Sequence, residues 1–524
     1  MNVEIYDSTL RDGEQGEGLS FSVLDKLRIV TLLDKLGVQY IEAGNPGSNP
    51  KDLEFFEKVK TLKLENSTLV AFGSTHRIGV SCTEDSNLKA LIESGTKAVA
   101  IFGKSWDFQV ERILKISKEE NLALIENTIR YLNKKGKYVF FDAEHFFDGF
   151  QENKEYALLT LSTALRAGAD ELVLCETRGG MLPLSVYEIV KEVKMAFPNA
   201  KLGVHTHNDI GCAVASSLLA VKGGVSSVQG TLLGFGERCG NANLSTIIAT
   251  LTLKQGIKTI NGPIDKLVST CRELASIANY RIPSSEPYIG KSAFAHKGGM
   301  HIDGVLKSPD SFEHINPDSV GATRRLLISE VAGRALVLKH LEKYFPQVDK
   351  EDSEAKALLS IVKEKEALGY QYEGAVASFE LLVRRKILEY KAFFSLVRYE
   401  TQGSLPYTYP NTHTAVIKVR VGEDDAITAT EGKGPVNALD KALRKVLEPF
   451  YPIVKEVVLT DYKVRVLDGK SATASKVRVV IESSDGDCSW TTVGVSEDII
   501  EASWLALTDS IEYKLFLDGT KPRG

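Results

Sequence analysis

The segment Lys201-Leu202-Gly203-Val204-His205-Thr206-His207-Asn208-Asp209 joins an apolar run to two histidines, and a helix-like pattern begins a few residues later. If residues 203–207 form a β-strand, His205 and His207 point to the same face, about 6.5–7 Å apart along the strand. Two imidazoles so placed suit one metal ion, with a carboxylate and a carbonyl-type oxygen to complete the site. Two polar histidines at a half-buried strand end are the alternative for such a pair taken alone.

The same pattern, a short apolar strand followed by a helix, recurs through the first half of the chain. We expect strands at residues 3–6, 40–43, 68–72, 97–102, 138–142, 171–175, 201–204 and 227–230. They are rich in Val, Ile, Phe and Ala with little alternation, which is typical of a parallel sheet covered on both faces. Eight β/α units over about 255 residues favour a closed α/β fold, the (β/α)8 TIM barrel, over an open doubly wound sheet.

Polar residues gather where the strands are expected to end, and a (β/α)8 barrel carries its reactive groups at those ends. They are Arg11 and Asp12, Glu42, Ser74 to Arg77, Lys104 and Ser105, Glu144 and His145, Glu176 and Thr177, His205 and His207, and Glu237 to Asn241. Such a series against apolar strand bodies predicts an active site at this end of the barrel.

The length of 524 residues leaves room for more than a barrel. We expect the barrel over residues 1–256 and helical linker subdomains over 257–395, where the pattern is helical and more charged. Over 396–524 the strand pattern returns and is twice followed by a helix, which predicts an α+β domain with a weak internal repeat.

Composition and charge exclude several classes of protein. A net charge of −5 without a basic stripe gives no case for nucleic acid. Six scattered cysteines without a C-x-x-C pair indicate neither a disulfide framework nor a thiolate zinc site. The chain opens as a strand, and no apolar run approaches the ~20 residues of a membrane span. We therefore expect a reduced, cytoplasmic protein without a membrane partner.

Four longer motifs include or follow the polar residues at the strand ends. They lie at residues 7–15, 205–209, 236–241 and 299–304. In sequence and order they resemble the motifs D-x-T-L-R-D-G-E-Q, H-x-H-N-D, G-E-R-x-G-N and G-[IM]-H-x-D-G of the metal-dependent Claisen-type enzymes. This family includes 2-isopropylmalate, homocitrate and citramalate synthases, and the resemblance extends over nearly the whole chain.

Further stretches are most similar to the long-form citramalate synthases of this family. They are residues 45–52, 71–75, 101–107, 141–149 and 292–299. Departures from the family pattern occur at Arg178, Glu176, Leu233, Gln109 and Asn45. These positions lie near the expected barrel mouth, so they bear on substrate choice and rate and leave the metal site intact.

The resemblance implies a divalent metal ion, either Mn²⁺, Mg²⁺, Zn²⁺ or Co²⁺. Its implied ligands are Asp12, His205, His207 and Asn241. A 2-oxo acid would fill the open positions, and Arg11 would donate to its keto oxygen as that atom becomes an alkoxide. A salt bridge to a neighbouring carboxylate is the alternative role of Arg11.

The resemblance further implies that Glu144 and His301 handle the proton taken from the methyl group of acetyl-CoA, without deciding which of them is the base. Glu144 as a partner of the metal ligands is the alternative. Thr177 would bind the carboxylate of the oxo acid, or else cap the next helix. Phe102 and Asp142 would bound the pocket, and Glu42 is a weaker candidate behind it.

The implied reaction condenses acetyl-CoA with pyruvate and hydrolyses the thioester, giving citramalate and CoA in isoleucine biosynthesis. An acyltransferase using 2-oxoisovalerate, a 2-isopropylmalate synthase of leucine biosynthesis, is the alternative. The C-terminal repeat resembles the family's allosteric domain, which implies a homodimer with isoleucine as effector. A plain dimerisation module is the alternative, because the repeat itself indicates only duplication.

Two other functional classes share parts of this pattern. A metal-dependent hydrolase also uses H-x-H, but there the pair usually opens the barrel at its first strand, whereas here it ends the seventh. A metabolite sensor that keeps the scaffold would have no need of intact Arg11, Asp12 and Glu144.

Overall fold

The computed structural model describes residues 2–327, 352–387, 390–403, 413–467, 475–486 and 488–523. The chain folds into two compact units. The first comprises Met1–Phe294 with His314–Arg324, and the second comprises Ala295–Glu313 with Arg325–Gly524.

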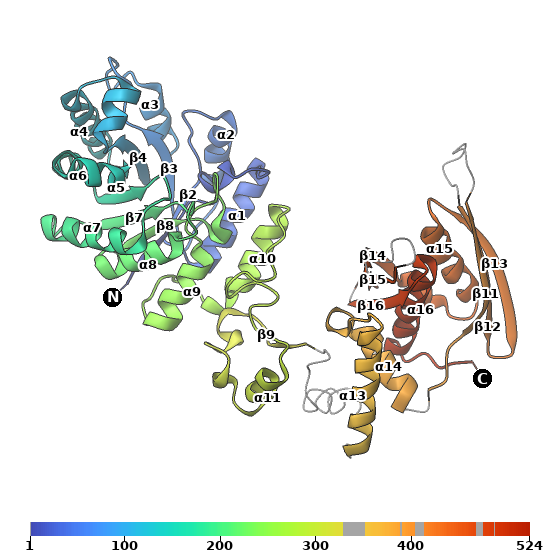
Figure 1. Cartoon of the computed structure of the whole chain (residues 1–524). Helices are drawn as coiled ribbons and strands as arrows, with labels where there is room; N and C mark the ends of the chain where they lie inside the picture. Colours follow the sequence, from blue (N-terminus) through green and yellow to red (C-terminus); the bar gives the residue numbers. More distant parts are fainter. Residues whose placement is uncertain are drawn as a thin grey trace. The chain divides into compact units, whose positions relative to one another are not determined.

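Eight parallel strands of the first unit close into a barrel ringed by helices (Figure 1). They are β1 (Glu4–Asp7), β2 (Tyr40–Glu42), β3 (Thr68–Ser74), β4 (Ala98–Lys104), β5 (Tyr138–Glu144), β6 (Glu171–Glu176), β7 (Leu202–Thr206) and β8 (Ser227–Gly230). The prediction of a (β/α)8 barrel is confirmed. The open-sheet alternative is wrong, because β1 pairs with β8 from Glu4–Ser227 to Asp7–Gly230.

Helices alternate with these strands and cover the outside of the barrel. They are α1 (Val23–Leu36), α2 (Pro50–Val59), α3 (Ser86–Glu93), α4 (Lys118–Lys134), α5 (Phe146–Glu152), α6 (Lys154–Ala167), α7 (Pro183–Ala196), α8 (Ala213–Gly223), α9 (Leu244–Gln255) and α10 (Leu267–Ile277). Local sequence sets their ends: Ser22 and Asp25 form a capping box at α1, and Gly37 ends it with a φ of 87°.

The barrel interior is filled with side chains rather than open. Tyr6, Phe140 and Val173 are fully buried there, and the rings of Tyr6 and Phe140 meet edge to face with centroids 5.1 Å apart. Such a filled core supports a site at one end of the barrel and leaves no channel through it.

A fully buried lysine ties together the first two β/α loops. Lys26 Nζ on α1 lies 2.6 Å from Asp52 Oδ1 and 2.8 Å from Glu14 Oε2. It also donates to the carbonyl oxygens of Leu10, at 2.9 Å, and Ala43, at 3.3 Å. A buried charge is tolerated only with partners of this kind. The ammonium thereby fixes the backbone beside the polar ends of β1 and β2.

The second unit begins with short elements and helices. They are β9 (Ala295–His296), α11 (Gly299–Lys307), β10 (Arg325–Leu326), α13 (Asp352–Ala367) and α14 (Val376–Ile387). Ile302 of α11 shares one apolar cluster with Leu358 of α13, Phe379 of α14 and Val493. Helix α11 is therefore built onto the elements that follow it in the chain.

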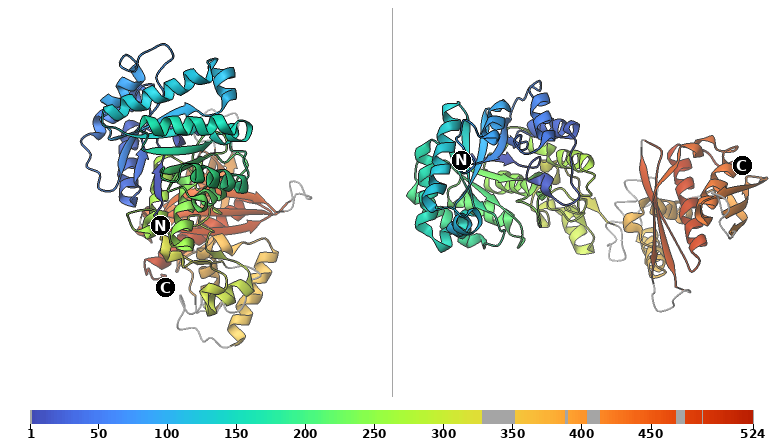
Figure 2. Two further views of the ribbon diagram at one scale, coloured as in Figure 1. Left: turned by 90° about the vertical axis from the view of Figure 1, so that its left-hand side faces the viewer. Right: turned by 90° about the horizontal axis from the view of Figure 1, so that it is seen from above.

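The rest of this unit contains the predicted repeat, a three-stranded antiparallel sheet followed by a helix in each copy. The first copy is β11 (Ser395–Gly403), β12 (His413–Val421), β13 (Asp424–Gly432) and α15 (Pro435–Leu447). The second is β14 (Val458–Val466), β15 (Val477–Ser484), β16 (Ser489–Ser496) and α16 (Ile499–Leu517). The two helices pack between the sheets (Figure 2). No helix in the described ranges is long and apolar enough to cross a membrane.

We expect Lys26→Met to lower the free energy of unfolding of the barrel by about 3–5 kcal/mol, because it leaves the carboxylates of Glu14 and Asp52 without their buried cation. Lys58→Met is the matched control, since Lys58 forms an exposed pair with Glu54 on α2, and pairs of that kind contribute about 0.5 kcal/mol or less. Urea unfolding of the full chain, followed by circular dichroism, measures both. Equal effects of the two substitutions would contradict the role of Lys26.

Candidate active site

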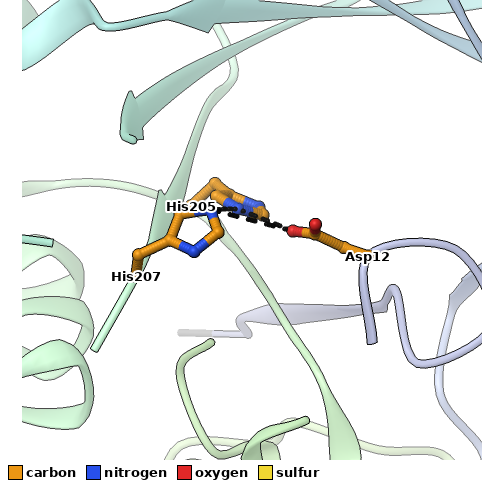
Figure 3. Close-up of side chains that lie close together, drawn as sticks. All are labelled: Asp12, His205 and His207. Carbon is orange, nitrogen blue, oxygen red and sulfur yellow. Dashed lines mark hydrogen bonds and ion pairs between the residues drawn. The ribbon is translucent and has the colours of Figure 1, made fainter. Parts of the chain in front are cut away.

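Three side chains from the ends of β1 and β7 converge at the top of the barrel (Figure 3). The Nε2 atoms of His205 and His207 are 3.2 Å apart. Asp12 Oδ2 lies 3.3 Å from the first and 3.9 Å from the second. Neighbouring ligands of one metal ion, each bound at about 2.0–2.2 Å, lie about 3 Å apart. The spacing therefore fits three donors to a common divalent cation.

Asn241 adds a fourth donor beside this set, since it forms a β-bridge with His207. Its Nδ2 donates to the carbonyl oxygen of Phe235 at 3.1 Å. Its Oδ1 is buried and has no hydrogen-bond partner among the described residues. Buried polar atoms are nearly always paired, so a carbonyl oxygen held in this way is free to bind a cation. The residues present fit a divalent metal site with nitrogen and oxygen ligands.

The electrostatics of these groups also suit a cation. Burial raises the pKa of Asp12, but Arg11 and His205 outweigh this effect and hold the pKa well below its usual range. Burial lowers the pKa of His205, but its hydrogen bond to Asp12 outweighs that effect and raises the pKa above the usual value. For His207, burial and the charge of His205 lower the pKa to about 4. At neutral pH the site thus offers an anionic carboxylate and a neutral imidazole.

Arg11 is held in one orientation beside the ligand set. Its Nε donates to Glu42 Oε2 at 2.7 Å, and one terminal nitrogen lies 3.3 Å from Asp12 Oδ1. Its guanidinium carbon lies 3.7 Å from the ring centroid of Phe72. Glu42 is fully buried and also accepts a hydrogen bond from Tyr6 at 2.8 Å. Arg11 thus forms the salt bridge of the alternative prediction and still lines the pocket.

A pocket of about 280 Å³ opens above these residues. The predicted site residues that line it are Arg11, Asp12, Phe102, Asp142, Glu144, Thr177, His205 and His207. Its wall is completed by Gln15, Phe72, Cys175, Glu237 and Arg238. Glu42 and Asn241 are not among the lining residues. Glu42 contacts Arg11, and Asn241 forms its β-bridge with His207. A space of this size is suited to a small acid.

Two carboxylates of β5 face this pocket, two residues apart as the strand period requires. Glu144 Oε2 forms an ion pair of 2.5 Å with Lys104 Nζ, its direct neighbour in the β4–β5 register. Asp142 is 4% exposed. Burial, and next the charge of Glu42, raise the pKa of Asp142 to about 7.

The remaining predicted pocket residues lie on two sides of the pocket. Phe102 stacks on Phe72 with ring centroids 5.4 Å apart. Thr177 Oγ1 accepts a hydrogen bond of 2.9 Å from the backbone of His145. Helix α7 has Leu182 at its N-cap, so the alternative that Thr177 caps the next helix is wrong.

His301 is not among the residues that line this pocket. It lies on α11 in the second unit, where it is exposed and stacks on Phe312 with centroids 4.2 Å apart. Its pairing with Glu144, which belongs to the first unit, stays a prediction.

Two residues of the site, Arg238 and Gln229, have no role that the sequence alone predicts. Arg238 forms hydrogen bonds of 2.7 and 3.0 Å with the carboxylate of Asp209, and another of 3.0 Å with the carbonyl oxygen of Thr177. It therefore clamps the loops after β6, β7 and β8 together. Gln229 contacts His205 from β8. The only sequence signal for Gln229 is a lone amide within a short strand, whereas Arg238 stands inside the G-E-R-x-G-N motif.

The fold and the site define a class, the (β/α)8 barrel enzymes with a divalent metal site at the carboxyl ends of the strands. The family model described as HMGL-like matches residues 2–277. The model for the homocitrate synthase post-HMGL domain-like region matches 288–368, and that for the LeuA allosteric (dimerisation) domain matches 373–515.

Relatives that match over nearly the whole chain identify the family within this class. The chain is 48% identical to the (R)-citramalate synthase of Aquifex aeolicus over 523 residues, which are 98% of each chain. It is 49% identical to that of Geobacter sulfurreducens over 522 residues, 98% of this chain and 97% of the relative. A probable 2-isopropylmalate synthase of Methanopyrus kandleri is 30% identical, over 96% of each chain. The chain belongs to the (R)-citramalate synthase family.

We expect the affinity for Mn²⁺ to fall as the pH falls, because protons and metal ions compete for the same imidazole nitrogens. The raised pKa of His205 makes this loss begin at a higher pH than an ordinary histidine, with a pKa of about 6.5, would give. Calorimetric titration of the chelator-treated protein between pH 5 and 8 measures the trend. Asp12→Ala is the control that removes binding across the range, and an affinity independent of pH would contradict ligation by His205.

Proposed function

We propose that the chain catalyses the condensation of acetyl-CoA with pyruvate, followed by hydrolysis of the thioester, to give (R)-citramalate and CoA. The observation that carries this proposal is the donor set of Asp12, His205 and His207 beside an immobilised Arg11, in a chain 48–49% identical to (R)-citramalate synthases. The product would enter isoleucine biosynthesis. We place the reaction in the cytoplasm, where acetyl-CoA is available.

We assign the metal site to Asp12, His205, His207 and Asn241. Their nitrogen and oxygen atoms suit Mn²⁺, Mg²⁺, Zn²⁺ or Co²⁺. Such an ion, when bound, supplies Lewis-acid polarisation of the keto group of pyruvate.

Arg11 donates a hydrogen bond to the keto oxygen as negative charge develops on that atom. The guanidinium is already held by Glu42 and by the Phe72 ring, so it need not reorganise during the reaction, which is the condition for effective electrostatic stabilisation. Thr177 donates its hydroxyl hydrogen to the carboxylate of pyruvate, since its oxygen already accepts from the backbone of His145.

Glu144 and His301 transfer the proton that leaves the methyl group of acetyl-CoA. The resulting enolate carbon attacks the keto carbon of pyruvate and forms the new carbon–carbon bond. Water then cleaves the thioester and releases the thiol of CoA. Lys104 holds the carboxylate of Glu144 through their ion pair at the rim of the pocket.

Phe102 and Asp142 select pyruvate by limiting the space beside the keto acid. Phe102 stacks on Phe72, which restricts its movement. The two extra methyl groups of 2-oxoisovalerate would therefore clash with this side of the pocket.

We propose residues 1–256 as the catalytic barrel, 257–395 as linker subdomains and 396–524 as the regulatory and dimerisation domain. The match of the LeuA allosteric (dimerisation) model to residues 373–515 supports a homodimer and an amino-acid effector. Isoleucine, the end product of the pathway, is the effector we propose.

We expect kcat/KM for pyruvate to exceed that for 2-oxoisovalerate by at least about 100-fold, because each additional methyl group in a closed pocket costs about 1–3 kcal/mol. Release of the CoA thiol, with each oxo acid in turn and product identification by chromatography, measures the ratio. A preference for 2-oxoisovalerate or 2-oxoglutarate would overturn the substrate assignment.

We expect Glu144→Gln to lower kcat by about 10²–10⁴-fold, the usual contribution of a positioned acid or base, while the affinity for Mn²⁺ stays unchanged. Glu155→Gln is the matched control, since Glu155 is exposed in the first turn of α6. Thiol release and calorimetric Mn²⁺ titration separate the two effects. Weakened Mn²⁺ binding would instead support Glu144 as a partner of the metal ligands.

A further inference from the structure

Gln229 on β8 connects two groups of the site through one side-chain amide. It is 1% exposed and is the direct neighbour of His205 in the β7–β8 register. Its Oε1 lies 3.0 Å from His205 Nδ1, and its Nε2 donates to Asp142 Oδ1 at 3.2 Å. A metal ligand and a residue of the pocket wall are thus attached to opposite ends of the same amide.

The amide determines which nitrogen of His205 carries hydrogen. A carbonyl oxygen only accepts hydrogen bonds, so His205 Nδ1 must donate to Gln229, and Nε2 of the neutral ring keeps its lone pair. Nε2 is the atom that lies 3.2 Å from His207 Nε2 and 3.3 Å from Asp12 Oδ2. In this orientation the Nε2 of Gln229 donates to Asp142 Oδ1, and a carboxyl group offers an acceptor oxygen in either protonation state.

The other end of the amide restrains Asp142. This carboxylate lines the pocket together with Arg11 and Phe102. The Gln229 amide holds Oδ1 on the β8 side of the barrel and thereby keeps the shape of the pocket wall.

We propose that Gln229 is a positioning residue that holds His205 in its metal-binding tautomer and, through the same amide, orients Asp142 in the wall of the oxo-acid pocket. The inference rests on the proposed function, because it assigns Gln229 to the metal and substrate sites of that reaction. Metal affinity and oxo-acid binding are then linked by one side chain that lines no part of the pocket itself.

Two substitutions separate the ends of the amide. Gln229→Met keeps the length of the side chain but removes both hydrogen bonds. We expect it to weaken Mn²⁺ binding by about 10–100-fold, the usual effect of losing the partner of a ligating histidine, and to raise KM for pyruvate. Gln229→Glu still accepts from His205 Nδ1 but has no N–H for Asp142. We expect it to keep Mn²⁺ affinity within about threefold of the native value while KM for pyruvate rises by about tenfold.

The measurements use the full chain after chelator treatment. Electron paramagnetic resonance measures the concentration of free Mn²⁺ in the absence of substrates and so gives the Mn²⁺ affinity. KM and kcat for pyruvate are measured separately by thiol release. Thermal unfolding confirms that each variant is folded. Gln39→Met is the matched control, because Gln39 Oε1 accepts from the backbone of Ile5 at 2.8 Å elsewhere in the barrel. It should lower thermal stability and leave Mn²⁺ affinity and KM unchanged.

Asp12→Ala distinguishes failure of this inference from failure of the proposed function. If Asp12→Ala binds Mn²⁺ as the native chain does, the metal site itself is wrong. If Asp12→Ala loses Mn²⁺ but Gln229→Met retains native affinity, the role of Gln229 toward His205 is overturned. Equal loss of Mn²⁺ in Gln229→Glu and Gln229→Met overturns the tautomer argument, and a native KM in both overturns the role toward Asp142.

Discussion

The structure at the carboxyl ends of the barrel strands depends on one buried positive charge. Lys26 is fully buried, and its ammonium group is satisfied by the carboxylates of Asp52 and Glu14 and by the carbonyl oxygens of Leu10 and Ala43. Because separating the ammonium group from these partners would leave a buried charge uncompensated, the four groups must keep their positions together. The loops after β1 and β2 are therefore parts of one ionic cluster and cannot move independently.

This cluster places the reactive side chains without touching them. Arg11 follows Leu10 in the chain, and Glu42 precedes Ala43. The carbonyl oxygens of Leu10 and Ala43 both accept from Lys26. The ion pair between Arg11 and Glu42 therefore joins two backbone segments that are already fixed. The site also contains buried polar atoms without a hydrogen-bond partner among the described residues, above all Oδ1 of Asn241. A fold tolerates such an atom where binding a ligand compensates for it.

Much of this arrangement could be predicted from the sequence. Apolar strand bodies with polar ends predict the barrel and its active end, and the family motifs assign Asp12, His205, His207 and Asn241 to one metal site. The features that the sequence does not predict depend on tertiary contacts that no periodicity encodes. The amide of Gln229 resembles any polar residue in a strand until its two partners are known.

The position of His301 also could not be predicted from the sequence. Its motif is plain in the sequence, but a motif does not say which unit carries it. The apolar contacts of Ile302 with residues far along the chain assign α11 to the second unit, and such contacts cannot be inferred from the local sequence.

The turn after β1 carries a guanidinium and a carboxylate on adjacent residues, Arg11 and Asp12, while the carbonyl of Leu10 is anchored to Lys26. Because Leu10 is fixed, an insertion of one residue between Leu10 and Arg11 would move Arg11 into the place of Asp12 and bring a cation among the imidazoles. A deletion at the same point would move Gly13 into that place and remove the carboxylate. The turn can therefore accept changes of side chain at its exposed positions far more readily than changes of length. In this part of the protein, spacing along the backbone is the property that cannot vary.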